Sequence, residues 1–119
     1  MIRAALFGVA LATFLLPLGA AYAKNAANDY LLGQSASGQA SLLSKAIGRD
    51  CTVKSVFYMG LGGPGFPKNQ ALWSAKCSNG ASFAVKVRSD GSNQVLECSV
   101  FQSLNPARCF KKLPGLKKP

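Results

Sequence analysis

Apolar and polar residues alternate through much of the chain between Cys51 and Phe101, with a period of two that is typical of β-strands. Four such runs follow one another, separated by a loop rich in Gly and Pro and by two short turns. In the first three runs the odd-numbered positions carry the apolar side chains, and in the fourth the even-numbered positions do. The pattern predicts a four-stranded sheet with one apolar face. The residues expected on this face are Val53, Phe57, Met59, Trp73, Ala75, Cys77, Phe83, Val85, Val87, Leu96, Cys98 and Val100.

The two turns predict how these strands pair. Ser78–Gly80 suits a three-residue hairpin loop in which the glycine is left-handed, and this loop pairs Trp73 with Val85 in the core. Asp90-Gly91 suits a two-residue type I′ turn, which pairs Val85 with Leu96. Because both turns place apolar positions opposite one another, we expect an antiparallel meander.

The cysteines are interpreted from the same register. If Cys51 lies opposite Cys77, then Val53 faces Ala75 on the apolar side of the sheet. Cys77 and Cys98 would flank the third strand about 9–10 Å apart, whereas a disulfide needs Cα atoms within about 7 Å. A zinc site is disfavoured because the chain has no histidine and no Cys-x-x-Cys pair. The predicted disulfides are Cys51–Cys77 and Cys98–Cys109, with a helical turn over Pro106–Lys111 inside the second loop.

One helix is expected before the strands. Gly38–Ile47 has apolar residues at helical spacing, with Ser37 as a possible N-cap and Gly48 just beyond the C-terminus. A helix of this length is not stable alone, so we expect it to pack on the sheet. The predicted fold class is α+β: one short N-terminal helix on a four-stranded antiparallel β-meander, stapled by two disulfides.

The N-terminus has the pattern of a signal peptide. Arg3 precedes the apolar run Ala4–Leu16, and Ala21–Ala23 fits a small-x-small cleavage site. An uncleaved anchor is the alternative, but the run is shorter than the about 20 residues that span a bilayer. An even number of cysteines in an exported chain indicates an oxidising compartment, either periplasmic or extracellular. The expected organisation is a signal peptide at 1–23, a flexible lead-in at 24–36, a single α+β domain at 37–111 and a mobile, basic tail at 112–119.

The composition argues against an enzyme. There is no histidine to act as a base, and the only carboxylate side chains are Asp29, Asp50, Asp90 and Glu97. None of them belongs to a recognisable catalytic pair, and the cysteines are expected in disulfides rather than as nucleophiles. We therefore predict a non-catalytic protein that needs no cofactor and no metal.

The charge indicates an anionic partner. The chain has 14 Lys and Arg against 4 Asp and Glu, a net charge of +10. Such a protein is expected to contact anionic lipid, lipopolysaccharide or glycan of the cell envelope, and no specific nucleic acid. The alternatives are that the charge only keeps the protein soluble and that the outer sheet face is half covered or forms a dimer. The candidate binding residues on that face are Lys54, Lys76, Lys86 and Arg88.

The Gly/Pro-rich loop at residues 60–68 supports a second hypothesis. A protruding loop with Leu61 and Phe66 as apolar anchors would suit a protein-interaction or inhibitor module. It resembles a phosphate-binding loop only weakly, because it lacks the Gly-Lys-Ser/Thr ending and a following helix. The alternative is a simple connection between strands, with glycines that only solve its backbone geometry.

Overall fold

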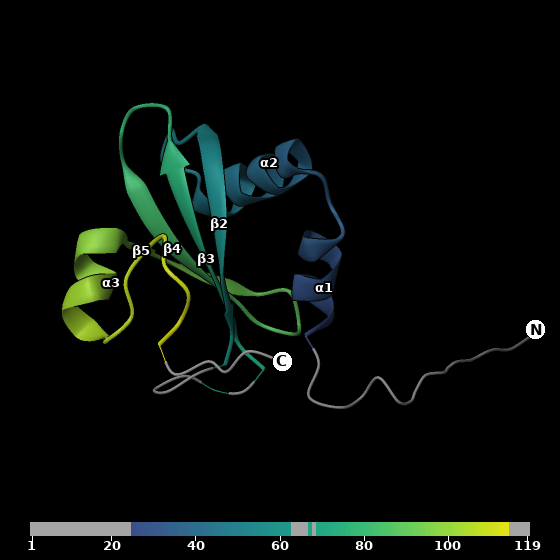
Figure 1. Cartoon of the computed structure of the whole chain (residues 1–119). Helices are drawn as coiled ribbons and strands as arrows, with labels where there is room; N and C mark the ends of the chain where they lie inside the picture. Colours follow the sequence, from purple (N-terminus) through teal and green to yellow (C-terminus); the bar gives the residue numbers. More distant parts are fainter. Residues whose placement is uncertain (1–24, 63–66, 68, 115–119) are drawn as a thin grey trace, which may run out of the picture.

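Four antiparallel strands form the centre of the fold, in the order β2-β3-β4-β5 (Figure 1). The structure, a computed structural model, describes residues 25–62, 67 and 69–114; the expected signal peptide and Phe66 lie outside these ranges. The antiparallel meander and both predicted disulfides are confirmed. The strands are β2 (Val53–Leu61), β3 (Ala71–Cys77), β4 (Ser82–Val87) and β5 (Asn93–Glu97), and the helices are α1 (Ala26–Leu32), α2 (Ala36–Ile47) and α3 (Cys98–Leu104).

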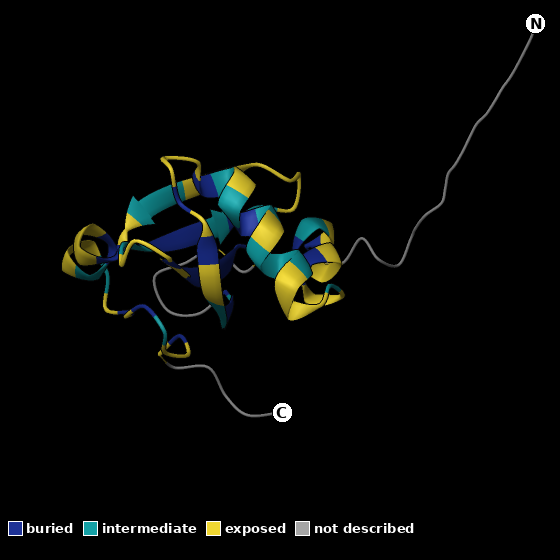
Figure 2. Ribbon diagram, turned by 90° about the horizontal axis from the view of Figure 1, so that it is seen from above, coloured by how far each residue is buried: buried dark blue, intermediate teal, exposed yellow. Residues whose placement is uncertain are grey.

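The sheet is covered on both faces, whereas the alternation of the sequence predicted one apolar face. On one face Leu43 and Ile47 of α2 share a buried cluster with Trp73 and Val85. This cluster is called the helix-side cluster, because α2 is the helix expected from the sequence. On the other face Phe101 of α3 belongs to a second cluster, which includes residues of the C-terminal segment. In Figures 1 and 2, α2 and α3 lie on opposite sides of the sheet. Each disulfide belongs to one of these clusters, so each side of the sheet has its own covalent link.

Strand β2 supplies apolar side chains to both clusters because its pairing with β3 shifts register twice, between Val53 and Ser55 and between Tyr58 and Gly60. Val53 pairs with Cys77, but after a register shift Val56 pairs with Ala75. Tyr58 therefore packs on the helix-side cluster, while Met59 is fully buried in the other one. The predicted pairing of Val53 with Ala75 is wrong, as is the placement of Phe57 and Met59 on the helix side. Each such shift adds one residue to the strand and exchanges the faces of the residues after it, so the second shift returns Leu61 to the helix-side cluster.

The β4–β5 turn also differs from the prediction. Val85 pairs with Val95, not with Leu96, while the other predicted pair, Trp73 with Val85, is confirmed. The loop has three residues between Arg88 and Ser92, and the Ser92 carbonyl accepts a hydrogen bond from the Arg88 amide at 2.9 Å. The same geometry closes the first hairpin, where the Ala81 carbonyl accepts from the Cys77 amide at 2.8 Å. In both loops an Asn or Asp side chain accepts from the amide two residues on, which favours the longer turn.

Gly91 is required by this turn. Its φ of 90° lies in the left-handed region, although a Cβ there would meet no other atom within 4 Å. We expect Gly91→Ala to lower the free energy of unfolding by about 1–2 kcal/mol through backbone strain alone. Gly33→Ala is the matched control, since Gly33 has φ −79° and a Cβ there would make ordinary contacts at 3.6 Å. Urea denaturation of both variants would test this, and equal losses would show that the turn is not strained.

The chain after β5 departs from the predicted strand and turn. The strand expected to continue to Val100 ends at Glu97, and Cys98–Leu104 forms α3. Cys98 and Phe101 are buried one turn apart, so a helix places both side chains on the sheet. The segment Pro106–Lys111 does not form the expected helical turn. It crosses the sheet as an irregular chain. Helix α2 begins at Ala36 with Ser35 as its N-cap, two residues before the expected start.

The segment expected to be a flexible lead-in contains helix α1. Its N-cap residue, Asn25, is 1% exposed, and its side-chain oxygen accepts from the Asn28 amide at 2.9 Å. The Asn25 Nδ2 donates to the carbonyls of Val87, at 2.7 Å, and Asn69, at 2.9 Å. Because the Asn25 side chain caps α1 and also donates a hydrogen bond to the backbone of β4, it fixes the beginning of α1 against the sheet.

Asn28 connects α1 to the aromatic core. Its Oδ1 accepts from the Trp73 indole N–H at 2.7 Å, and its Nδ2 donates to the Tyr58 hydroxyl at 3.0 Å. The Tyr58 and Trp73 rings are 4.9 Å apart between centroids. Burial raises the pKa of Tyr58, an effect that the hydrogen bond from Asn28 partly offsets. Asn28 itself is 1% exposed, so its amide has these partners in place of water.

Candidate functional site

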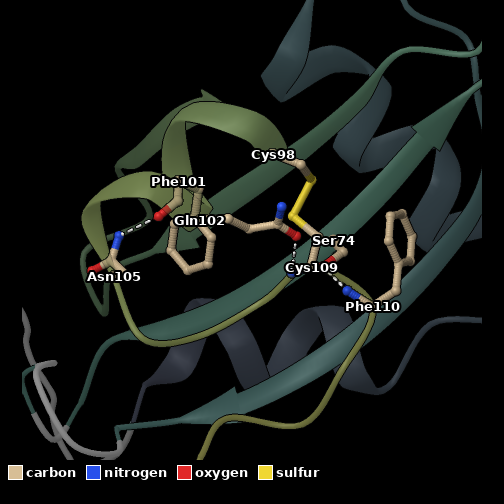
Figure 3. The surroundings of a disulfide bond; sticks show 7 residues. All are labelled: Ser74, Cys98, Phe101, Gln102, Asn105, Cys109 and Phe110. Atoms are coloured by element: carbon tan, nitrogen blue, oxygen red, sulfur yellow. Dashed lines mark hydrogen bonds between the residues drawn. A yellow bond between two sulfur atoms is a disulfide. The ribbon is translucent and has the colours of Figure 1, made fainter.

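The segment Ala107–Leu113, here called the strap, lies across the sheet face opposite α2 (Figure 1). The Cys98–Cys109 disulfide joins it to α3, and the Cys109 amide donates to the Gln102 Oε1 at 3.1 Å (Figure 3). These contacts hold the beginning of the strap against α3.

Two further hydrogen bonds hold the strap on the sheet. The Phe110 amide donates to the Ser74 Oγ at 2.9 Å, as Figure 3 shows, and Ser74 is fully buried in β3. The Leu113 amide donates to the Met59 carbonyl of β2 at 3.0 Å. Phe110 takes a φ of 62°, which a residue with a side chain seldom adopts unless its surroundings impose it. The strap is therefore fixed from both sides of this strained residue.

The side chains of the strap differ in burial. Ala107, Cys109 and Leu113 are buried in the second cluster, whereas Arg108, Lys111 and Lys112 are exposed. The buried residues face the sheet, so the cationic side chains extend along the solvent-facing side of the strap or into solvent. The Lys112 ammonium lies 5.8 Å from the ring centroid of Phe57 and 5.5 Å from that of Tyr58. A cation near an aromatic ring gains about 0.5–1 kcal/mol at an exposed site, which favours one position for this charge.

A fourth cation lies on the sheet face that the strap crosses. Lys76 is exposed and is two residues along β3 from Ser74, on the same face. The group Lys76, Arg108, Lys111 and Lys112 is called the basic strap surface below. None of the four forms an ion pair with an acidic residue within the described part of the chain. No carboxylate side chain of the described segments therefore neutralises these charges.

The four basic residues predicted from the sequence do not form one open face. Lys76 and Lys86 lie on the same side of the sheet, but Leu72, Ser74 and Ala84 on that side are at most 1% exposed. The strap and α3 cover this middle part, so the four residues do not share one open surface, and the face is partly covered as the alternative interpretation had it. Of the predicted residues, Lys76 lies two positions along β3 from Ser74, the residue that accepts from the Phe110 amide of the strap.

Lys86 and Arg88 lie at the other end of the face, towards the β4–β5 turn. There the carboxylate of Asp90 accepts from the Ser92 amide, which lowers the pKa of Asp90, with a further contribution from the nearby Arg88. Arg88 thus has an anionic neighbour within the protein. We regard Lys86 and Arg88 as a separate group and as a weaker candidate for anion binding than the basic strap surface.

Lys54 lies at the bulge of the edge strand β2 and lines an open groove on the α2 side together with Lys45. Small side chains of α2, including Ala40 and Ser41, leave this groove open, and the Ser44 Oγ accepts from the Val53 amide at 2.9 Å. A lysine and a bulge on an edge strand also prevent pairing with other chains, which is a structural role for Lys54.

The two anchors expected in the Gly/Pro-rich loop have different positions. Leu61 is the last residue of β2, pairs with Ala71 and is partly buried against the helix-side cluster. It is therefore part of the sheet and not of a protruding loop tip. Phe66 lies outside the described residues, so the interaction hypothesis for this loop stays without structural support.

An open, mostly apolar hollow of ≈ 160 Å³ lies between α1, α2 and β4. Its lining includes Leu31, Leu43 and Val85, all of them also part of the core. Pockets that bind drug-sized molecules measure about 300–1,000 Å³, so this hollow is small for such a ligand. We do not assign a ligand to it.

The described residues contain no group suited to a metal site, no free cysteine and no membrane span. No group of three His, Cys, Asp or Glu there could hold a metal ion, and all four cysteines are in disulfides. No helix of these ranges is long and apolar enough to cross a membrane. In comparisons with known proteins, no family model matches the chain, and neither a curated protein nor a solved structure shows significant similarity to it.

Arg108 and Lys111 are not among the site residues predicted from the sequence, and Lys112 was expected in the mobile, basic tail. A signal was present, because Cys109 must reach Cys98 and therefore carries its neighbours onto the domain. Leu113 is a second signal, because an apolar residue that follows two lysines can anchor the end of the segment in the core.

Proposed function

We propose that this protein is a small exported, non-catalytic binding module that contacts an anionic component of the cell envelope through its basic strap surface. The observation that carries the proposal is the presence of four cations that have no acidic partner among the described residues, on a backbone held by hydrogen bonds and a disulfide. Because this backbone is already ordered and no internal ion pair has to be broken, anion binding costs less free energy.

The location is part of the proposal. Disulfides are typical of extracellular and periplasmic proteins, and two of them lie in this small domain. The apolar N-terminal sequence supports export of the chain. A basic module in such a compartment meets the anions named above, namely phosphate-bearing lipid, lipopolysaccharide and acidic glycan.

The absence of catalysis is proposed on chemical grounds. The chain has no histidine, and its four carboxylate side chains, Asp29, Asp50, Asp90 and Glu97, lie in different segments of the fold. A binding function needs only electrostatic complementarity, which gives fast association and strong salt dependence.

A salt titration of the purified oxidised protein tests the proposal. The probes are vesicles of phosphatidylcholine with phosphatidylglycerol, and the acidic polysaccharide alginate. We expect binding to at least one probe at low ionic strength and a loss of about tenfold or more when the Debye length falls from about 10 Å to about 3 Å. A protein that binds neither probe at low salt contradicts the proposal. Retention that does not respond to salt contradicts it too and would favour the loop hypothesis.

A further inference from the structure

Helix α3 exposes two large apolar side chains next to each other. Leu104 is 70% exposed and Val100 is 42% exposed. They are four residues apart on the helix and are therefore neighbours on its surface. The inner side of the same helix is occupied by Cys98 and Phe101, which face the sheet. This apolar pair contributes nothing to the described core.

The apolar pair and the basic strap surface belong to one layer of the fold. α3 and the strap are consecutive in the chain and are joined by the Cys98–Cys109 disulfide. Both cover the same sheet face, and in Figure 2 the exposed residues of α3 and of the strap lie on the side of the sheet opposite α2. From Cys98 to Pro114 the chain contains three basic residues and no acidic one.

We propose that this layer docks on the surface of an anionic lipid bilayer. Arg108, Lys111 and Lys112 contact the phosphates of the headgroups, while Leu104 and Val100 enter the boundary between headgroups and acyl chains. The inference rests on the proposed function and names the anionic partner as a lipid surface. Charge complementarity selects this partner, because a purely apolar partner would leave the cations desolvated and unpaired. A soluble glycan would satisfy the cations but would leave the apolar pair in water.

Combined apolar and electrostatic contacts are the usual requirement for peripheral membrane binding, since either alone gives weak attachment. The arrangement of this layer provides both kinds of contact from one rigid unit. The opposite layer provides a control, because Leu32 of α1 is 44% exposed, and α1 packs on the other side of the sheet through Leu31.

The test compares Leu104→Ser with Leu32→Ser on both probes. We expect Leu104→Ser, and more so Val100→Ser/Leu104→Ser, to lower the affinity for phosphatidylglycerol-containing vesicles by about tenfold, because insertion of the side chain is lost. Leu32→Ser should leave vesicle binding unchanged, and none of the variants should change binding to alginate. Since all three side chains are exposed, the variants should unfold at the temperature of the wild type.

A second pair of variants reports insertion without depending on affinity. The single tryptophan, Trp73, is 1% exposed, so a new surface tryptophan is distinguishable from it. Fluorescence of Leu104→Trp should shift to shorter wavelength on addition of anionic vesicles, and that of Leu32→Trp should not.

The outcomes separate this inference from the proposed function. If wild-type binding is salt-sensitive but the Leu104 variants bind vesicles normally and Leu104→Trp shows no shift, the inference is overturned and the proposed function remains. If the wild type binds neither probe, both are overturned.

Discussion

Replacement of Asn28 by alanine is expected to lower the free energy of unfolding by about 3 kcal/mol. The side chain joins α1 to Trp73 and Tyr58, and its loss leaves the Trp73 indole N–H buried without an acceptor. A buried donor without a partner costs about 1–3 kcal/mol, and the second hydrogen bond and a small cavity add to this. Because Asn28 lies on α1, the helix should also detach more readily, with a red shift of Trp73 fluorescence before global unfolding.

Denaturant unfolding followed by Trp73 fluorescence measures this effect. Asn93→Ala is the matched control, because Asn93 is an exposed residue at the start of β5 and should change stability by less than about 0.5 kcal/mol. A loss below about 1 kcal/mol for Asn28→Ala would show that water or another group can replace the amide, and that α1 is not fixed by this contact.

Removal of the strap disulfide is the second change with a large expected effect. Cys98→Ser/Cys109→Ser opens a loop with a sequence separation of 11, for which the chain-entropy estimate is about 3 kcal/mol. The left-handed Phe110 next to Cys109 adds strain that the disulfide no longer holds. We expect the sheet and α2 to remain folded while the strap samples a detached state.

Trypsin detects that detached state, because it cleaves after Lys111 and Lys112. In Cys98→Ser/Cys109→Ser the bond between Lys112 and Leu113 should be cut at least tenfold faster than in the wild type, at a temperature where both are folded. Cys51→Ser/Cys77→Ser is the matched control: it should lose about 3.5 kcal/mol of stability, yet protect this bond while folded. Equal cleavage rates in the two double variants would mean that the strap is held by packing and not by its disulfide.

The sheet and the disulfides could be predicted from the sequence because several local rules agree there. The first hairpin is an example, since Asn79-Gly80 and the alternation on both sides give the same pairing of Trp73 with Val85. The register of β2 could not be predicted, because it depends on a bulge and on a second buried face that the alternation of one strand does not reveal. The turn at Asp90-Gly91 fits two loop lengths locally, and tertiary packing of Val95 selects the longer one.

The candidate site was harder to predict for a related reason. Lys76 was identified by its position on a strand, but its partners Lys111 and Lys112 follow an irregular segment with no periodicity. Their placement depends on the contacts of Phe110 with Ser74 and of Leu113 with Met59, both of which join residues far apart in the sequence. Lys86 and Arg88 show the converse, because the alternation that put them on the same face could not show that α3 and the strap cover the space between.

The position of the charges, and not their number, is expected to decide the binding of anions. The most direct test compares Lys76→Gln/Lys111→Gln/Lys112→Gln with Lys54→Gln/Lys86→Gln/Arg88→Gln, which removes the same charge from other parts of the surface. Each lysine near an anionic membrane contributes about 1 kcal/mol, so the first variant should bind phosphatidylglycerol-containing vesicles about 100-fold more weakly than the wild type. The second should lose less than about fivefold, through the lower net charge alone. Equal losses in the two variants would contradict the account, because binding would then follow net charge and the strap would have no special part in it.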